Sequence, residues 1–512
     1  MRGKGLLVLT VMSWLIALMP FMLHGGPFLE DAWEHMSMAR LYAKEGVMVW
    51  GPDVDLSSKW PLANLLIYIL MTIPGIPILQ ASQAIPFLAG LSIIPFYLIL
   101  NKLYGRRSIA LLCSLALTLE SFHITMISSV AKVTLTFYPL MCSILILTML
   151  VSRPSLSHLV LFSLASIGVL FGHHYTSLFF LVFLTILSAY MLIGWLEGEV
   201  DEKTTFTMSV SAALFAIYFI TYATALRAWQ GFIQLNDILL LFSCIVVSLL
   251  ALSTKTRLKT RFLRFSVLFI LAPLIGVMIL RGEVYAIYFL PTNIHLYDVL
   301  GYALITLLTI VGGTLIERSS REAMFVRAYM ASGLAMLLFS FTIGFVYLGV
   351  VLLLKAMYII MPAVFTWLGL SLRRARKKLF IIMTLVMAAS LILTPISGIR
   401  CAWLQDPGVG GLVSYDRGQY EELKLLASYL RGNSLVADTP VQYLALMFDE
   451  LKVRGISPRT RLSAGDTLVV LRRSWEAGLL ESGYEWFNID TVIRNPCDQV
   501  FSGGHLIILV VV

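Results

Sequence analysis

Residues 5–46 read GLLVLTVMSWLIALMPFMLHGGPFLEDAWEHMSMARLYAKEG, an apolar run followed at once by a polar stretch. The apolar run has about the length that crosses a bilayer as a helix. It follows Arg2 and Lys4, and no small-residue cleavage site follows it, so we predict a retained first span rather than a signal peptide. Just past this span the chain gathers ionisable side chains: Glu30, Asp31, Glu34 and His35.

The composition is that of a membrane protein. Hydrophobic residues make up 59% of the chain and charged residues only 13%, with a mean hydropathy of +0.86. A soluble domain carries about 25% charged residues. Apolar runs near span length recur, and lipid leaves backbone groups no partners outside their own helix. We therefore predict an all-α polytopic membrane protein with about 13 transmembrane helices.

The basic residues set the predicted orientation. They cluster in short links such as KLYGRRS, TKTRLKTRFLRF and RRARKK, which the positive-inside rule places in the cytoplasm. The net charge of +9 therefore indicates orientation signals and not a nucleic-acid surface. Loop 24–60 then lies outside and carries juxtamembrane helices. Segment 61–79 is broken by Pro74 and Pro77, and we predict that it is juxtamembrane or re-entrant.

Two domains follow from this pattern. Residues 1–395 form the transmembrane domain, and residues 396–512 form a small extracytoplasmic α/β domain. In the tail, QYEELKLLASYL predicts an amphipathic helix, and SLVADT, DTLVVLRR, DTVIRN and HLIILVVV predict short strands.

Cys401 and Cys497 lie outside the apolar spans, on the side predicted to be oxidising. We predict that they form a disulfide, the alternative being two unpaired thiols.

The acidic stretch 29–45 predicts a helix on the membrane surface. On such a helix Asp31 and His35 are four residues apart and share one face. Acids in a first turn are also ordinary caps and dipole partners, so this alternative stays open.

Further ionisable residues fall at or near the predicted outer side, among them Lys59, Lys132, His173, His174, Arg281 and Lys355. Lys355 lies about 17 residues before a basic inner link, which places it roughly 25 Å away, at the outer hydrocarbon boundary. A cation there could meet a lipid phosphate, or it could be a snorkelling lysine.

The stretch DAWEHMSMARLYAKEG resembles the acidic motif of the GT-C superfamily of membrane glycosyltransferases. DAWEHM in particular is similar to the D-P-[WY]-x-[HN]-[YM] run of oligosaccharyltransferase catalytic subunits. The resemblance implies a GT-C-like fold over about residues 1–395 and a polyprenyl- or dolichyl-phosphate sugar as donor.

Two features depart from the oligosaccharyltransferase pattern. The second outer loop, HITMISSVAKVTLTF, contains no acid, and no W-W-D-Y-G run occurs. A bound divalent metal is therefore disfavoured, and we predict no cofactor. The resemblance points instead to metal-independent members that transfer a single sugar.

The predicted chemistry needs one base and one cation. Asp31 takes the proton of the acceptor hydroxyl, with Glu30 and Glu34 as second choices, and the sugar is transferred with inversion. The predicted substrate-binding residues are His35, Lys355, Arg281, His174 and Lys59. Lys355 meets the phosphate and Arg281 is its reserve.

Two other classes of function remain. One is a non-catalytic GT-C-like protein that binds lipid-linked sugars or a partner; the other is a lipid or solute transporter. The expected partners are a lipid-linked sugar donor and membrane lipids, while the acceptor is unknown and no nucleic acid is expected. The expected location is a prokaryotic cell membrane, with the endoplasmic reticulum as the alternative.

Overall fold

The computed structural model of the chain describes most of the membrane domain and parts of the tail. The described residues are 4–28, 31–48, 59–227, 235–252, 296–313, 315–316, 320–344, 349–404, 417–430, 435–445, 447–448, 451, 453–456, 460–463, 465–472, 479–482, 485–488, 497–502 and 506–511.

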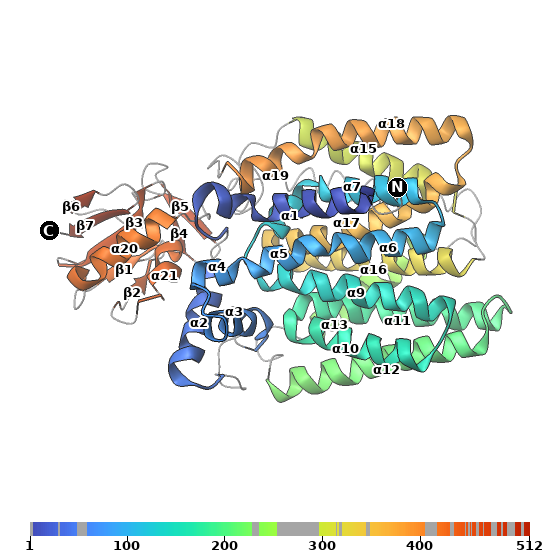
Figure 1. The fold of residues 1–512 in the computed structure, drawn as a ribbon, viewed down its shortest axis with the longest axis horizontal. Coiled ribbons are helices and arrows are strands. Elements are labelled where there is room, and N and C mark those ends of the chain that lie inside the picture. The colour runs from blue at the N-terminus through green and yellow to red at the C-terminus, as the bar shows by residue number, and fades with distance from the viewer. Residues whose placement is uncertain are drawn as a thin grey trace.

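The chain is an integral multi-pass membrane protein, built as a bundle of long apolar helices that run side by side in Figure 1. Eight segments of the described chain are long and apolar enough to cross a membrane. They are α1 (Lys4–His24), Ile78–Tyr104 (α4, Ile78–Ser82; α5, Ala84–Leu91; α6, Ile93–Tyr104), α9 (Lys132–Ser152), α11 (His174–Leu196), α12 (Glu202–Ala225), most of α16 (Arg321–Gly344), most of α17 (Gly349–Arg374), and Lys377–Ala402 (α18, Lys377–Leu393; α19, Pro395–Ala402).

The remaining predicted spans correspond to shorter or bent helices. The pair α7 (Arg107–Thr118) and α8 (Ser121–Ile127) is bent by 68° and makes a ninth candidate if counted as one broken span. Three more predicted spans fall on the shorter apolar helices α10 (Leu156–Gly172), α13 (Leu235–Leu252) and α15 (Leu296–Gly313). Another predicted span falls in 253–295, outside the described residues.

The break between α7 and α8 has a local cause. Glu120 caps α8, because its carboxylate accepts hydrogen bonds from the backbone N–H of Phe122 (3.1 Å) and of His123 (2.7 Å). A side chain that satisfies the first N–H groups of a helix starts a new helix at that point. The apolar pattern alone predicts one span over about 108–122, whereas the structure ends α7 at Thr118.

One end of the bundle carries the C-terminal domain, and we call it the domain end (Figure 1). The acidic stretch forms α2 (Asp31–Glu45) at this end. Segment 61–79 forms α3 (Leu62–Thr72), which has 11 residues and is therefore too short to cross a bilayer.

The C-terminal domain combines a mixed sheet with two helices. The sheet order is β2-β1-β3-β7-β6, with β1 parallel to β2 and β3, and β7 antiparallel to β3 and β6. The elements are α20 (Arg417–Leu430), β1 (Leu435–Ala437), α21 (Thr439–Ala445), β2 (Val453–Gly455), β3 (Thr467–Leu471), the β4 (Leu479–Ser482) and β5 (Glu485–Asn488) hairpin, β6 (Cys497–Ser502) and β7 (Leu506–Val511). The predicted α/β character is confirmed.

Two apolar cores hold the molecule together. The first fills the helix bundle. The second joins α2 and α3 to the C-terminal domain, and includes Trp33, Met36, Ile67, Leu423 and Leu444. Because one continuous core spans these elements, the opening helix and the C-terminal domain are fixed to the same end of the bundle.

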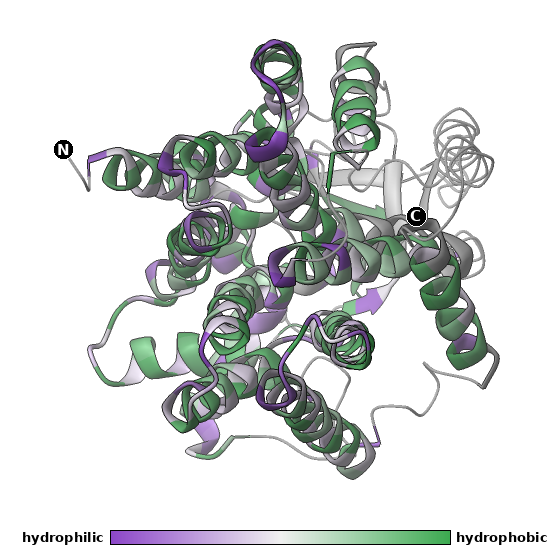
Figure 2. Cartoon of the chain, turned by 90° about the vertical axis from the view of Figure 1, so that its right-hand side faces the viewer, coloured by the Kyte–Doolittle hydropathy of each residue, from purple (hydrophilic) through white to green (hydrophobic). Residues whose placement is uncertain are grey.

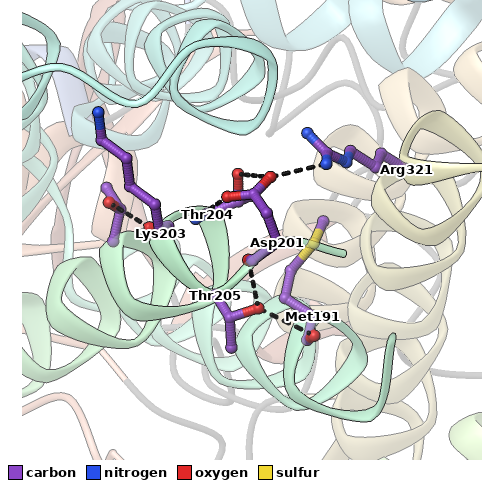
Figure 3. Close-up of polar contacts among 7 residues, drawn as sticks. Met191, Asp201, Lys203, Thr204, Thr205 and Arg321 are labelled. Carbon is purple, nitrogen blue, oxygen red and sulfur yellow. Dashed lines mark hydrogen bonds and ion pairs between the residues drawn. The ribbon is translucent and has the colours of Figure 1, made fainter. Parts of the chain in front are cut away.

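The opposite end of the bundle carries polar links between helices, while the helices themselves are apolar along much of their length (Figure 2). In the link before α12, Asp201 forms an ion pair with Arg321 at 2.6 Å and accepts hydrogen bonds from Thr204 (Figure 3). Arg373, at the end of α17, donates to the carbonyl of Leu103 at 2.9 Å. The helix ends near these residues therefore meet at this end.

Candidate active site beneath the opening helix

The start of α2 lies beside the second outer loop. The backbone N–H of Val130 donates to the carbonyl of Phe28 at 3.1 Å. Asp31 opens α2 three residues after Phe28, and Lys132 opens α9 two residues after Val130. This hydrogen bond therefore brings the first turn of the acidic helix close to the first turn of α9.

Basic side chains from four parts of the chain converge below α2. The charges of Lys132 and Lys355 lie close enough to act on the rings of His173 and His174, and Lys132 also acts on His35. His35 and His173 are buried, whereas the other three are partly exposed. We call these five residues the basic cluster. The predicted residues His35, His174 and Lys355 are thus brought together.

Aromatic contacts fix the histidines of this cluster. The His174 ring lies 4.9 Å from that of Trp60 and 4.5 Å from that of His173, measured between centroids. His173 caps α11, with its ring nitrogen 3.1 Å from the hydroxyl of Thr176. The predicted residue Lys59 precedes Trp60, and its backbone carbonyl accepts a hydrogen bond from Tyr222. Trp60 therefore anchors the segment that follows the first outer loop against the cluster.

His35 is neutral in the folded protein at neutral pH. Burial lowers the pKa of His35 well below its usual value, and the positive charge of Lys132 lowers it further. The amide of Asn64 lies beside the ring and partly offsets this shift. His35 and Asn64 are both buried and form a polar contact between α2 and α3.

A second set of buried polar groups lies around Tyr358 of α17. Tyr358, three residues after Lys355, packs its ring on those of His123 (5.6 Å) and Phe137 (4.4 Å). His123 belongs to the short helix that Glu120 caps, and the carboxylate of Glu120 also accepts a hydrogen bond from Tyr302. Glu120 is therefore a buried carboxylate that already has three donors, which is the role of a structural cap.

Several predicted site residues cannot be placed. Glu30 and Arg281 lie outside the described residues, and Asp31 is described only as the first residue of α2. Glu34 is partly buried, and its backbone carbonyl accepts a hydrogen bond from Ser37 at 2.9 Å. The roles of these acids stay predictions. The Cys401–Cys497 disulfide also stays a prediction, because the side chain of Cys497 is outside the described set.

The predicted site left out two residues that shape this region. Lys132 was noted as an ionisable residue on the outer side, and the structure places it in the basic cluster. Glu120 lies three residues before the loop that we described as free of acids. The signal for Glu120 was the motif E-S-F-H, an acid directly before a short apolar helix, which is a capping pattern.

No protein-family model and no curated protein matches this sequence. Among solved structures, the archaeal oligosaccharyltransferase AglB from Archaeoglobus fulgidus, in complex with an inhibitory peptide and a dolichol-phosphate, matches with a TM-score of 0.51 and 12% identity. The match covers 87% of this chain and 64% of AglB. This chain has the GT-C fold.

Two other GT-C glycosyltransferases align more weakly. Arabinofuranosyltransferase AftD from Mycobacteria has a TM-score of 0.47 at 14% identity. The match covers 100% of this chain and 42% of the AftD chain. ArnT from Cupriavidus metallidurans, bound to undecaprenyl phosphate, has a TM-score of 0.40 at 10% identity. The match covers 99% of this chain and 98% of the ArnT chain. The predicted GT-C-like architecture is confirmed, while this chain spans less than two thirds of the length of AglB.

Proposed function

We propose that the chain is a membrane glycosyltransferase that moves a sugar from a polyprenyl- or dolichyl-phosphate donor to an acceptor at the domain end. The observation that carries the proposal is the basic cluster, because it gathers two lysines and three histidines directly below an acid-bearing helix. Ionisable residues that membrane helices pack against one another, instead of leaving them to reach the interface, mark ligand sites or proton pathways.

The cluster suits a phosphate group. Lys132, His174 and Lys355 are partly exposed, so a lipid headgroup can reach them from the rim of the bundle. Ammonium groups bind phosphate as point charges and stabilise the negative charge that develops on it when the sugar leaves. The GT-C fold supports this assignment, because AglB, which has the same fold, was captured with a dolichol-phosphate.

The proposed reaction is a single displacement. The acceptor hydroxyl attacks the anomeric carbon, the bond from that carbon to the phosphate oxygen breaks, and the electron pair leaves with the lipid phosphate. Asp31 takes the proton of the hydroxyl, and the configuration at the anomeric carbon inverts. The leaving phosphate is stable as an anion, so the mechanism uses no general acid, no metal ion and no cofactor.

A transfer assay with purified protein tests the proposal. The protein is given polyprenyl-phosphate donors that carry radiolabelled sugars, together with membrane lipid and glycan acceptors. We expect release of the lipid phosphate and labelling of an acceptor. Tight donor binding without turnover would instead indicate a non-catalytic lipid-sugar binder. Movement of the donor across vesicles without transfer would indicate a transporter. Either result would contradict the proposed activity.

A further inference from the structure

The opening helix α2 is held on two faces by two different domains. Toward the membrane domain, Tyr42 meets Tyr68 of α3 edge to face, with centroids 6.2 Å apart. Toward the C-terminal domain, Trp33 stacks on Tyr420 of α20 with centroids 5.6 Å apart and an interplanar angle of 6°. The helix is thus a layer between the bundle and the C-terminal domain (Figure 1).

The contact with the C-terminal domain continues beyond this one stack. Tyr420 stacks in turn on Phe448, and Arg40 of α2 donates to the backbone carbonyl of Met447. At the other end of the helix, a Cβ on Gly25 would lie 3.3 Å from the Cβ of Arg417, so α20 begins directly against the turn that precedes α2. The C-terminal domain therefore contacts the turn that precedes α2, the first turns of the helix and its later part.

The position of α2 depends on such packing. The helix has 15 residues, and helices of this length are marginal in water by themselves. Gly46 ends the helix in a left-handed conformation (φ +67°), and Gly25, also left-handed (φ +68°), ends α1 before it, so α2 does not continue either neighbouring helix. On its membrane side it packs against α3, where His35 and Asn64 are both buried.

We infer that the C-terminal domain is a clamp that holds α2, and with it Asp31, in place over the basic cluster. This rests on the proposed function, in which Asp31 is the base. Lys132, His173, His174 and Lys355 come from membrane helices or the links between them, so they keep their places without the clamp. The domain thus controls the rate of transfer and leaves donor binding to the bundle, with Trp33 and Tyr420 as positioning residues.

The test compares variants of one helix in the full-length protein. Tyr420→Leu removes the stacked ring, Tyr420→Phe keeps it, and Leu425→Ala changes an exposed residue of α20 as the matched control. We expect Tyr420→Leu to lower kcat by at least about tenfold, because small misplacements of a reacting group are costly, and to leave donor affinity within about twofold. Tyr420→Phe and Leu425→Ala stay close to the unchanged protein.

A second readout is independent of activity. Amide hydrogen exchange of residues 31–45 should accelerate in Tyr420→Leu, while that of α9 and α17 stays unchanged. If Tyr420→Leu leaves both kcat and this exchange unchanged, or weakens donor binding as much as kcat, the clamp is wrong. Should Tyr420→Leu fail to fold, Trp33→Leu tests the same stack from the other side, with the same outcomes.

The experiment distinguishes failure of the proposed function from failure of the clamp. If the unchanged protein transfers no sugar to any acceptor, the proposed function fails, and so does the rate control that rests on it. The exchange readout then still decides whether the domain holds α2: acceleration confined to residues 31–45 supports the holding, and unchanged exchange overturns it.

Discussion

The two ends of the bundle both carry basic residues, but they surround them differently. At the end opposite the domain, Lys102, Arg106, Lys377 and Lys378 are exposed at or next to the ends of helices. At the domain end, His35 and His173 are buried, and Lys132 and Lys355 lie partly exposed beside them. Exposed basic residues at helix ends orient a membrane protein. Arg327 of α16, near the end opposite the domain, is buried, but it donates to the backbone carbonyl of Ile316. The candidate site is therefore marked by lysines and histidines that separate helices bring to one place, and not by burial alone.

Removing the proposed base gives the largest expected effect. Asp31→Asn keeps the shape and hydrogen bonding of the side chain but takes up no proton, so kcat should fall about 10²–10⁴-fold. Donor affinity should be unchanged, because the phosphate contacts lie elsewhere. The matched control is Glu45→Gln at the exposed far end of the same helix, with no effect on kcat. Near-full activity in Asp31→Asn would make Asp31 a helix cap only.

Neutralising the lysines of the cluster should act on binding. Lys355→Met and Lys132→Met each remove a charge but keep an apolar stem, and each should weaken donor binding by about 10–100-fold, the usual value of a hydrogen bond to a charged group. Lys378→Met, an exposed lysine of the opposite end, is the control. Titration with a fluorescent polyprenyl-phosphate measures the affinities. If all three variants bind the donor as tightly as the wild-type protein, the lipid phosphate does not bind at the domain end.

The burial of His35 predicts a pH dependence of stability. Because burial lowers its folded pKa, the unfolded chain binds a proton below about pH 6.5 that the folded chain does not, so stability falls as pH falls. The loss approaches about 1.4 kcal/mol per pH unit below that value. Thermal unfolding at pH 7.5 and 5.5 should show a smaller acid loss, by about 1 kcal/mol, in His35→Leu. An identical loss in both proteins would mean that His35 is not buried neutral.

The ion pair of the opposite end should give the smallest effect. Asp201 and Arg321 have side chains 47% and 37% exposed, so solvent screens their attraction. Arg321→Met should cost no more than about 1 kcal/mol, and Asp201→Asn, which also weakens the cap of α12, about the same. Neither should change sugar transfer. A large loss of activity in either variant would contradict the division between the two ends.

Strong periodic signals were predictable from the sequence. The first span, α2, α20 and the apolar strands β1, β3 and β7 lie where the pattern of residues placed them. The short strand β2 (VRG) and the polar strand β6 (CDQVFS) were missed, because their sequences carry no apolar alternation and they form by pairing with β1 and β7. Tertiary pairing decides such strands.

The candidate site was predictable only in part. Asp31, His35 and Lys355 stood out because ionisable residues are rare in so apolar a chain. Lys132 was noted with them but was not assigned to the site, since its place beside the histidines depends on how α9 meets α11 and α17. The stack of Trp33 on Tyr420 joins residues almost 400 positions apart, and no local sequence pattern predicts such a contact.

The most direct test of the central claim is a structure of the protein with a polyprenyl-phosphate sugar bound. The claim predicts that the phosphate lies within ion-pair distance of Lys355 and Lys132, with the sugar between them and the start of α2. It also predicts that the anomeric carbon faces Asp31. A phosphate bound among the exposed lysines of the opposite end, or at the domain end but away from both cluster lysines, would contradict the account.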